Sequence, residues 1–155
     1  TPFIEKSIYK SCIIKKKIVE KDEKESNSRK ILNLGHTFGH AYEGAYKYSN
    51  KLNHGEAVIF GILSASKFSL KNKILPKKEF DLINNHLIKF NLPRNLKKIF
   101  SIKDLKNIIA FMEKDKKNND KKINLVLIKK IGNPIYNKKF ETKKIHSFIK
   151  NELTN

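Results

Sequence analysis

Cysteine and long apolar runs are scarce in this chain of 155 residues. Cys12 is the single cysteine and cannot form an internal disulfide, so we expect a reducing compartment, the cytoplasm, rather than secretion. The longest apolar stretch, residues 57–63, is far shorter than the ~20 residues of a transmembrane helix, and we expect no membrane partner. The first residue is Thr1 rather than methionine, followed by Pro2, so we expect the chain to begin at a domain boundary.

Acidic residues and arginines are also few. The chain has 15 acidic against 34 basic residues, a formal net charge of +19, yet only two of the basic residues are arginines, Arg29 and Arg94. Proteins that grip nucleic acids favour arginine for bidentate contacts, and here the lysines are scattered over every segment rather than gathered in a stripe. The charge therefore predicts a solvated lysine surface and no nucleic-acid partner. A basic helical nucleic-acid-binding module remains the alternative outside the enzymes.

The apolar spacing predicts a mainly α-helical fold in a single domain, because 39% hydrophobic residues suffice for one core at this length. The segment 57–65 is apolar on nearly every side and is expected to be the central, buried helix, opened by a capping box of Asn53 and Glu56. Helices are predicted at 2–24, 29–46, 53–65, 76–90, 101–112 and 141–153.

One segment has the pattern of β-structure. Ile123, Leu125 and Leu127 alternate along the chain, and a turn follows at Gly132. The sequence therefore predicts one small β-hairpin near Ile123 to Tyr136.

Rare residues cluster between positions 35 and 61, which hold five of the six glycines and three of the five histidines. Glycine inside a helix costs ~1 kcal/mol relative to alanine, so Gly35 and Gly39 indicate close approach of a ligand or another helix. On a helical wheel, the predicted helix 29–46 has one polar stripe without lysine: Arg29, Asn33, His36 and His40. This stripe predicts a functional face.

The histidines suggest a metal site. His36 and His40 are spaced i, i+4, but Thr37 stands where a zinc protease has its glutamate base, so that class is disfavoured. His54 begins the buried helix, and two or three imidazoles without cysteine suit a catalytic zinc. Glu43 and Glu56 are candidate carboxylate ligands, although the helix cap explains Glu56 better.

At these residues the sequence resembles a known family. The segment from Arg29 to Glu43 reads RKILNLGHTFGHAYE, and the segment from Leu52 to Val58 reads LNHGEAV. Together they resemble the signature of the 3-dehydroquinate synthases, which belong to the sugar-phosphate cyclases. The resemblance extends to Lys15 and to 22–25, 91–93, 115–117 and 131–132, so it covers essentially the whole chain as the family's C-terminal helical domain.

The resemblance implies roles for individual residues. His36 and His54 would be metal ligands, for zinc or another divalent ion such as cobalt. His40 would relay protons, with Glu25 as a second catalytic residue. The substrate-binding residues would be Lys15, Arg29, Asn33 and Lys116. Asn27 and Asn91 stand where the family usually has glycine, and asparagine is the next best residue for a left-handed turn.

The resemblance also implies an activity. The family converts 3-deoxy-arabino-heptulosonate 7-phosphate, a sugar acid phosphate, to 3-dehydroquinate in the shikimate pathway towards chorismate and aromatic amino acids. The enzyme is a carbon-oxygen lyase that eliminates phosphate. NAD is bound mainly by an N-terminal α/β domain, and the third metal ligand is a glutamate on a segment that precedes Thr1.

The resemblance implies that this N-terminal domain lies outside these 155 residues. We therefore expect the chain alone to be inactive, the N-terminal domain to be its partner, and the full enzyme to be a homo-oligomer. A sister sugar-phosphate cyclase and a metal-dependent polyol dehydrogenase are the enzyme alternatives. A dehydrogenase of unphosphorylated alcohols would not need a phosphate-binding lysine at position 116.

Overall fold

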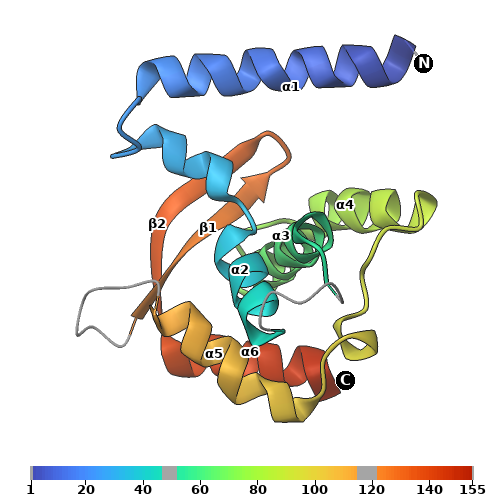
Figure 1. Cartoon of the computed structure of the whole chain (residues 1–155), viewed down its shortest axis with the longest axis vertical. Helices are drawn as coiled ribbons and strands as arrows, with labels where there is room; N and C mark the ends of the chain where they lie inside the picture. Colours follow the sequence, from blue (N-terminus) through green and yellow to red (C-terminus); the bar gives the residue numbers. More distant parts are fainter. Residues whose placement is uncertain (1, 47–51, 115–121, 155) are drawn as a thin grey trace. The chain divides into compact units, whose positions relative to one another are not determined.

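The computed structural model describes residues 2–46, 52–114 and 122–154. The fold is mainly α-helical with one two-stranded antiparallel sheet, as predicted (Figure 1). The chain divides into two compact units, one up to Leu32 and one from Asn33 onwards, and each is described by itself.

The elements follow one another along the chain with short connections. The longer helices are α1 (Pro2–Lys21), α2 (His36–Ala45), α3 (His54–Lys71), α4 (Lys77–Lys89), α5 (Leu105–Lys114) and α6 (Thr142–Thr154). Three short 3-10 helices are η1 (Ser28–Asn33), η2 (Leu96–Lys98) and η3 (Ile102–Asp104), and the strands are β1 (Lys122–Lys130) and β2 (Asn133–Glu141). Over the described residues, no helix has both the length and the apolar character that a bilayer span requires.

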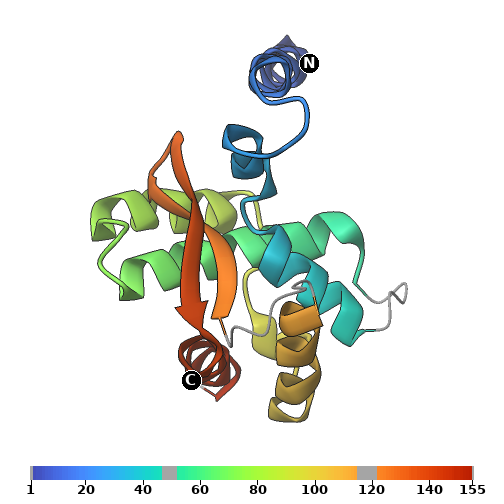
Figure 2. The same ribbon diagram turned by 90° about the vertical axis from the view of Figure 1, so that its left-hand side faces the viewer.

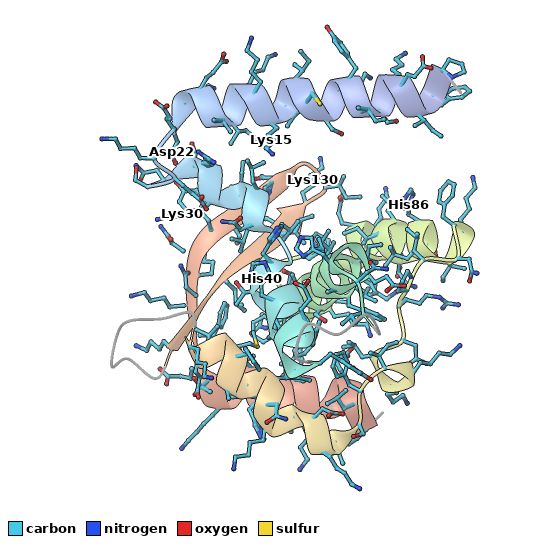
Figure 3. The ribbon with its side chains drawn as sticks, viewed as in Figure 1. Lys15, Asp22, Lys30, His40, His86 and Lys130 are labelled. Atoms are coloured by element: carbon cyan, nitrogen blue, oxygen red, sulfur yellow. The ribbon has the colours of Figure 1, made fainter. Side chains whose placement is uncertain are left out.

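In the N-terminal unit, α1 ends three residues earlier than the expected residue 24, because the Asp22 carboxylate organises a turn there. Its oxygens accept hydrogen bonds from the backbone N–H groups of Ser26 (3.0 Å), Asn27 (2.7 Å) and Arg29 (2.9 Å). These bonds, first of all the one from Arg29, lower the pKa of Asp22 because they stabilise the ionised form. Figure 3 shows Asp22 at this turn.

The left-handed residue of this turn is Glu25, with φ 54°, and not Asn27. The expectation that Asn27 takes this conformation is therefore wrong. Asn27 uses its backbone N–H to bind Asp22 instead. The second asparagine behaves as expected, since Asn91 has φ 50° directly after α4.

In the C-terminal unit, α3 is the central helix. Ala57, Phe60, Leu63 and Ala65 are buried in its middle, which confirms the prediction for 57–65. Its start carries the predicted capping box. The Asn53 side chain accepts from the Glu56 N–H at 3.0 Å, and the Glu56 carboxylate accepts from the Asn53 N–H at 3.2 Å.

The predicted helix 29–46 is broken. Its first part is the 3-10 helix η1, Gly35 then takes the left-handed conformation with φ 85°, and α2 starts anew at His36. The break has a packing cause, because a Cβ on Gly35 would lie 2.6 Å from the backbone nitrogen of Ile62 in α3. The polar stripe of Arg29, Asn33, His36 and His40 is therefore not one helix face, although the apolar side with Phe38 is buried as expected.

The predicted hairpin is present and extends beyond Tyr136 to Glu141. Gly132 is left-handed in the turn, with φ 79°, and Leu127 pairs with Ile135 across the strands. The alternating apolar residues of β1 enter the core: Ile123, Leu125 and Leu127 are buried. Figure 2 shows β2 leading from the turn to α6, at the far end of the hairpin.

Candidate metal and substrate site

Helices α2 and α3 approach each other through glycines. A Cβ on Gly39 would lie 3.0 Å from the carbonyl oxygen of Ala57, and a Cβ on Gly61 would overlap the carbonyl oxygen of Gly35. Side chains at these positions would hold the helices apart, as they do at ordinary helix contacts. The close packing explains three of the five clustered glycines, Gly35, Gly39 and Gly61, and brings the histidine-bearing parts of the two helices together.

Three imidazoles meet at this contact. His36 is the first residue of α2, His40 lies one turn later, and His54 is the first residue of α3 (Figure 3 labels His40). The ring centroid of His36 lies 5.3 Å from that of His40 and 6.1 Å from that of His54. The His40 and His54 centroids are also 6.1 Å apart. The structure therefore brings together the three histidines that the sequence singled out.

His36 is the least exposed of the three. Burial lowers the pKa of its imidazole, and the neighbouring His40 and His54 lower it further. The ring is therefore neutral near pH 7. Its Nδ1 is buried and has no hydrogen-bond partner within the described residues. A buried polar atom without a partner is costly, which makes this nitrogen a candidate for an interaction with a ligand.

Glu43 completes the cluster. Both of its carboxylate oxygens lie 3.1 Å from Nδ1 of His54. One ligand atom from each of His40, Glu43 and His54 can be chosen so that all three lie within 4.8 Å of one another. Glu56 makes the capping box instead, as its position in the sequence indicated.

These residues fit a divalent transition metal. Neutral imidazole nitrogens and a carboxylate oxygen are the donors of catalytic zinc sites and also suit cobalt. The Nδ1 of His36 has no partner among the described residues, and the pKa of the ring is lowered. Both agree with this use, since a protonated imidazole cannot bind a metal.

The remaining predicted residues lie elsewhere. Asn33 ends η1 in the C-terminal unit, and the left-handed Gly35 separates it from α2. Lys15 on α1, Glu25 in the Asp22 turn and Arg29 in η1 belong to the N-terminal unit. Lys116 lies outside the described residues.

Two hollows of the C-terminal unit are separate from the histidines. One of about 370 Å³ lies between the start of α3, at Leu52 and Glu56, and the loop 91–95. The other, of about 480 Å³, lies beside the ion pair of Lys67 and Glu152. Neither is lined by His36, His40 or His54 among the described residues, so we assign the candidate site to the imidazole cluster.

Two functional features escaped sequence reasoning. Glu43 was recognised only as a candidate ligand, and its bond to His54 joins residues that are 11 positions apart on different helices. The role of Asp22 in shaping the turn of Glu25 and Arg29 was also missed. The available signal was local: Asp22 stands four residues before Ser26, a spacing at which an Asp side chain can accept backbone N–H groups.

The fold of the chain is similar to part of the solved structures of 2-deoxy-scyllo-inosose synthase. A structure of 2-deoxy-scyllo-inosose synthase has a TM-score of 0.69 at 21% identity, over 86% of this chain and 36% of that one. A second structure of that enzyme, complexed with carbaglucose-6-phosphate, NAD+ and Co2+, has a TM-score of 0.63 at 24% identity, over 82% of this chain and 35% of that one. At these identities the likeness shows the fold alone.

Sequence comparison is more specific. Residues 1–118 match the family "3-dehydroquinate synthase C-terminal". The chain is 62% identical to the 3-dehydroquinate synthase of Pelagibacter ubique over 99% of its own length and 42% of that protein. It is 40% identical to the enzyme of Clostridium acetobutylicum over 95% of its own length and 40% of that protein. The chain belongs to the 3-dehydroquinate synthase family and spans about two fifths of the length of these relatives.

Proposed function

We propose that the chain is the metal- and substrate-binding C-terminal domain of an enzyme that converts 3-deoxy-arabino-heptulosonate 7-phosphate to 3-dehydroquinate and phosphate. The enzyme is a carbon-oxygen lyase that acts in the cytoplasm as a homo-oligomer. An N-terminal α/β domain binds NAD, and a glutamate outside these residues supplies a further metal ligand. The proposal rests on the family membership and on the coverage of about two fifths of the relatives.

The observation that carries the proposal is the imidazole cluster on two glycine-packed helices. His36 and His54 are the residues that would hold zinc or cobalt, and the buried Nδ1 of His36 without a partner among the described residues supports this use. Lewis acidity towards a substrate hydroxyl is the chemistry that the metal supplies when bound. Reversible oxidation of that hydroxyl is the chemistry that bound NAD supplies.

His40 is the proposed proton relay. It is exposed on α2, and its ring centroid lies 5.3 Å from that of His36. An imidazole there can take a proton from a substrate hydroxyl and return it, because imidazole is a common general acid and base in enzymes. Glu25 is the proposed second catalytic residue, from the N-terminal unit.

The substrate carries a carboxylate and a phosphate, which require cations. Lys15, Arg29 and Lys116 are the proposed cationic contacts, and Asn33 is the proposed partner of substrate hydroxyls. Arg29 suits this role because its guanidinium can bind an anionic group through two parallel hydrogen bonds. One of its guanidinium nitrogens donates to the Glu23 carbonyl oxygen, which holds the side chain in the Asp22 turn.

The test is reconstitution. The chain is mixed with the NAD-binding half of a related 3-dehydroquinate synthase, NAD and Co2+ or Zn2+, and phosphate release from the heptulosonate phosphate is followed. We expect release by the mixture, none by either half alone, and loss of release in the His36→Ala variant.

Product analysis completes this test. The proposal requires 3-dehydroquinate as the carbocyclic product, whereas a different carbocycle would identify a sister cyclase. Phosphate release that persists in His36→Ala would contradict the assignment of the metal site. The Lys78→Ala variant is the control, because Lys78 is exposed at the start of α4 and belongs to neither proposed contact set.

A further inference from the structure

The contact between Glu43 and His54 has a specific geometry. Glu43 lies in the last turn of α2, three residues after His40, and His54 begins α3. Nδ1 of His54 lies 3.1 Å from Oε1 and 3.1 Å from Oε2 of Glu43. A carboxylate can only accept, so Nδ1 must carry the proton, and that proton is shared between two oxygens.

The two side chains differ in exposure. The Glu43 side chain is 12% exposed and the His54 side chain is 61% exposed. A carboxylate that has lost most of its water needs a hydrogen-bond donor, and Nδ1–H of His54 is the donor that faces both of its oxygens. The bond therefore gives the Glu43 carboxylate a hydrogen-bond donor and keeps the proton of His54 on Nδ1.

The backbones on both sides are held firmly. The capping box of Asn53 and Glu56 fixes the first turn of α3, which contains His54. Gly39 packs against Ala57 one turn before Glu43, so the two helices cannot slide without a clash. The spacing between Glu43 and His54 is consequently set by helix packing rather than by a surface loop.

We propose that Glu43 is a positioning residue for the metal site. It holds His54 as the Nδ1–H tautomer and leaves Nε2 as the nitrogen with a free lone pair for the metal. Carboxylates that orient metal-binding imidazoles in this way also raise the basicity of the ligand nitrogen. The metal part of this inference rests on the proposed function, but the tautomer of His54 does not.

The competing role for Glu43 is direct coordination. Ligand atoms of His40, Glu43 and His54 can lie within 4.8 Å of one another, so the three could in principle share an ion. Direct coordination of zinc or cobalt by Glu43 depends on the charged carboxylate, because the neutral amide oxygen of glutamine is a much weaker ligand for these ions. Positioning needs only an acceptor for Nδ1–H, which the amide oxygen of glutamine also provides.

The first experiment measures the tautomer without metal. Long-range proton–nitrogen-15 correlation spectra of the metal-free chain are recorded at about pH 8, where imidazoles are neutral. We expect the Nδ1–H form of His54 in the wild type and in Glu43→Gln, and a mixture of tautomers in Glu43→Ala. Glu113→Ala, a matched loss of an exposed carboxylate on α5, should leave His54 unchanged. An unaltered His54 tautomer in Glu43→Ala would overturn the proposal.

The second experiment measures Co2+ affinity of the same variants through the visible absorption of the bound ion. Loss of an orienting partner costs about 10–100-fold in metal affinity. We expect this loss in Glu43→Ala and recovery of most of it in Glu43→Gln. Equal weakening in both variants would overturn the proposal in favour of direct coordination.

The design separates this inference from the proposed function. Circular dichroism checks that both Glu43 variants fold, and glutamine keeps the size of the side chain should alanine disturb the packing. If reconstitution fails while His54 keeps its glutamate-dependent tautomer, the proposed reaction is wrong and the positioning role stands. If phosphate is released but Glu43→Ala leaves the His54 tautomer unchanged, only the positioning role is wrong.

Discussion

The Asp22 turn and the α2–α3 contact hold the proposed site residues by different means. The turn is polar: one carboxylate accepts backbone N–H groups from three residues and shapes the segment of Glu25 and Arg29. The helix contact depends on close packing and on the absence of side chains at Gly39 and Gly61. Packing of this kind is stiff, whereas a hydrogen-bonded turn can open locally. The proposed metal ligands therefore lie on the more rigid of the two elements, the α2–α3 contact.

The largest effect on the α2–α3 contact is expected from Gly61→Ala. The new Cβ would overlap the Gly35 carbonyl oxygen and lie 2.8 Å from the Gly39 nitrogen, both of which are backbone atoms that cannot turn away. We expect a loss of about 3 kcal/mol or more in the free energy of unfolding, at or above the usual cost of overpacking. Urea denaturation measures it.

Gly55→Ala is the matched control. A Cβ on Gly55 has the Asn53 Oδ1 at 3.6 Å as its nearest neighbour, an ordinary contact at the exposed start of α3. Stability should be unchanged or slightly higher, since alanine favours helices by ~1 kcal/mol over glycine. Equal destabilisation by the two substitutions would contradict the role of glycine packing.

A smaller effect is expected at the buried hydroxyls that join the same helices. The Tyr42 and Ser64 hydroxyl oxygens lie 2.7 Å apart in the core. Burial raises the pKa of Tyr42, so this hydroxyl stays protonated well above pH 10. Tyr42→Phe leaves Ser64 without its partner and should cost about 1–2 kcal/mol. In a double-mutant cycle, adding Ser64→Ala should cost less than in the wild type, and strict additivity would show that the two hydroxyls do not interact.

The polar turn should respond differently to substitution. Asp22→Ala removes the acceptor of the Ser26, Asn27 and Arg29 amides, so we expect their hydrogen exchange to accelerate. Exchange of the core amides of α3 should not change. Glu20→Ala, which removes an exposed carboxylate in the last turn of α1, is the control and should affect neither set. Faster exchange in α3 would mean that the Asp22 turn is not a local element.

The same turn predicts a pH dependence. The N–H of Arg29, followed by those of Asn27 and Ser26, lowers the pKa of Asp22 below its usual 3.8. A lowered pKa means that the ionised carboxylate stabilises the turn at every pH above its usual value. This stabilisation is lost as the pH falls through the lowered folded-state pKa. The Asn27 and Arg29 amide signals should therefore move only below pH 3.8. A midpoint above that value would contradict the hydrogen bonds.

The sequence predicted those features that depend on neighbouring residues. The capping box of Asn53 and Glu56 spans three positions, and the buried segment 57–65 is a continuous run, so both were readable. The break at Gly35 could not be predicted from neighbouring residues, because its left-handed conformation accompanies close packing against Ile62 on another helix. The pairing of Glu43 with His54 escaped for the same reason, since it depends on how α2 meets α3.

For the site, the sequence identified the three histidines by their rarity and spacing. The helical wheel that placed His36 and His40 on one face with Arg29 and Asn33 assumed an unbroken helix. The histidines cluster because His36 and His40 share α2 and because α3 starts beside them. Arg29 precedes the break and belongs to the other unit. Periodicity describes residues within one element, and it fails across a left-handed residue.

The central claim is that His36 and His54 form an incomplete metal site, and calorimetric titration of the metal-free chain with Zn2+ tests it most directly. Two imidazoles without the third, carboxylate ligand should bind zinc weakly, and His36→Ala should abolish even this binding. Adding the N-terminal half of a related synthase should convert the wild type, but not the variant, to tight binding of one zinc. Tight stoichiometric zinc binding by the chain alone would contradict the claim, and zinc binding that survives His36→Ala would contradict the assignment of His36.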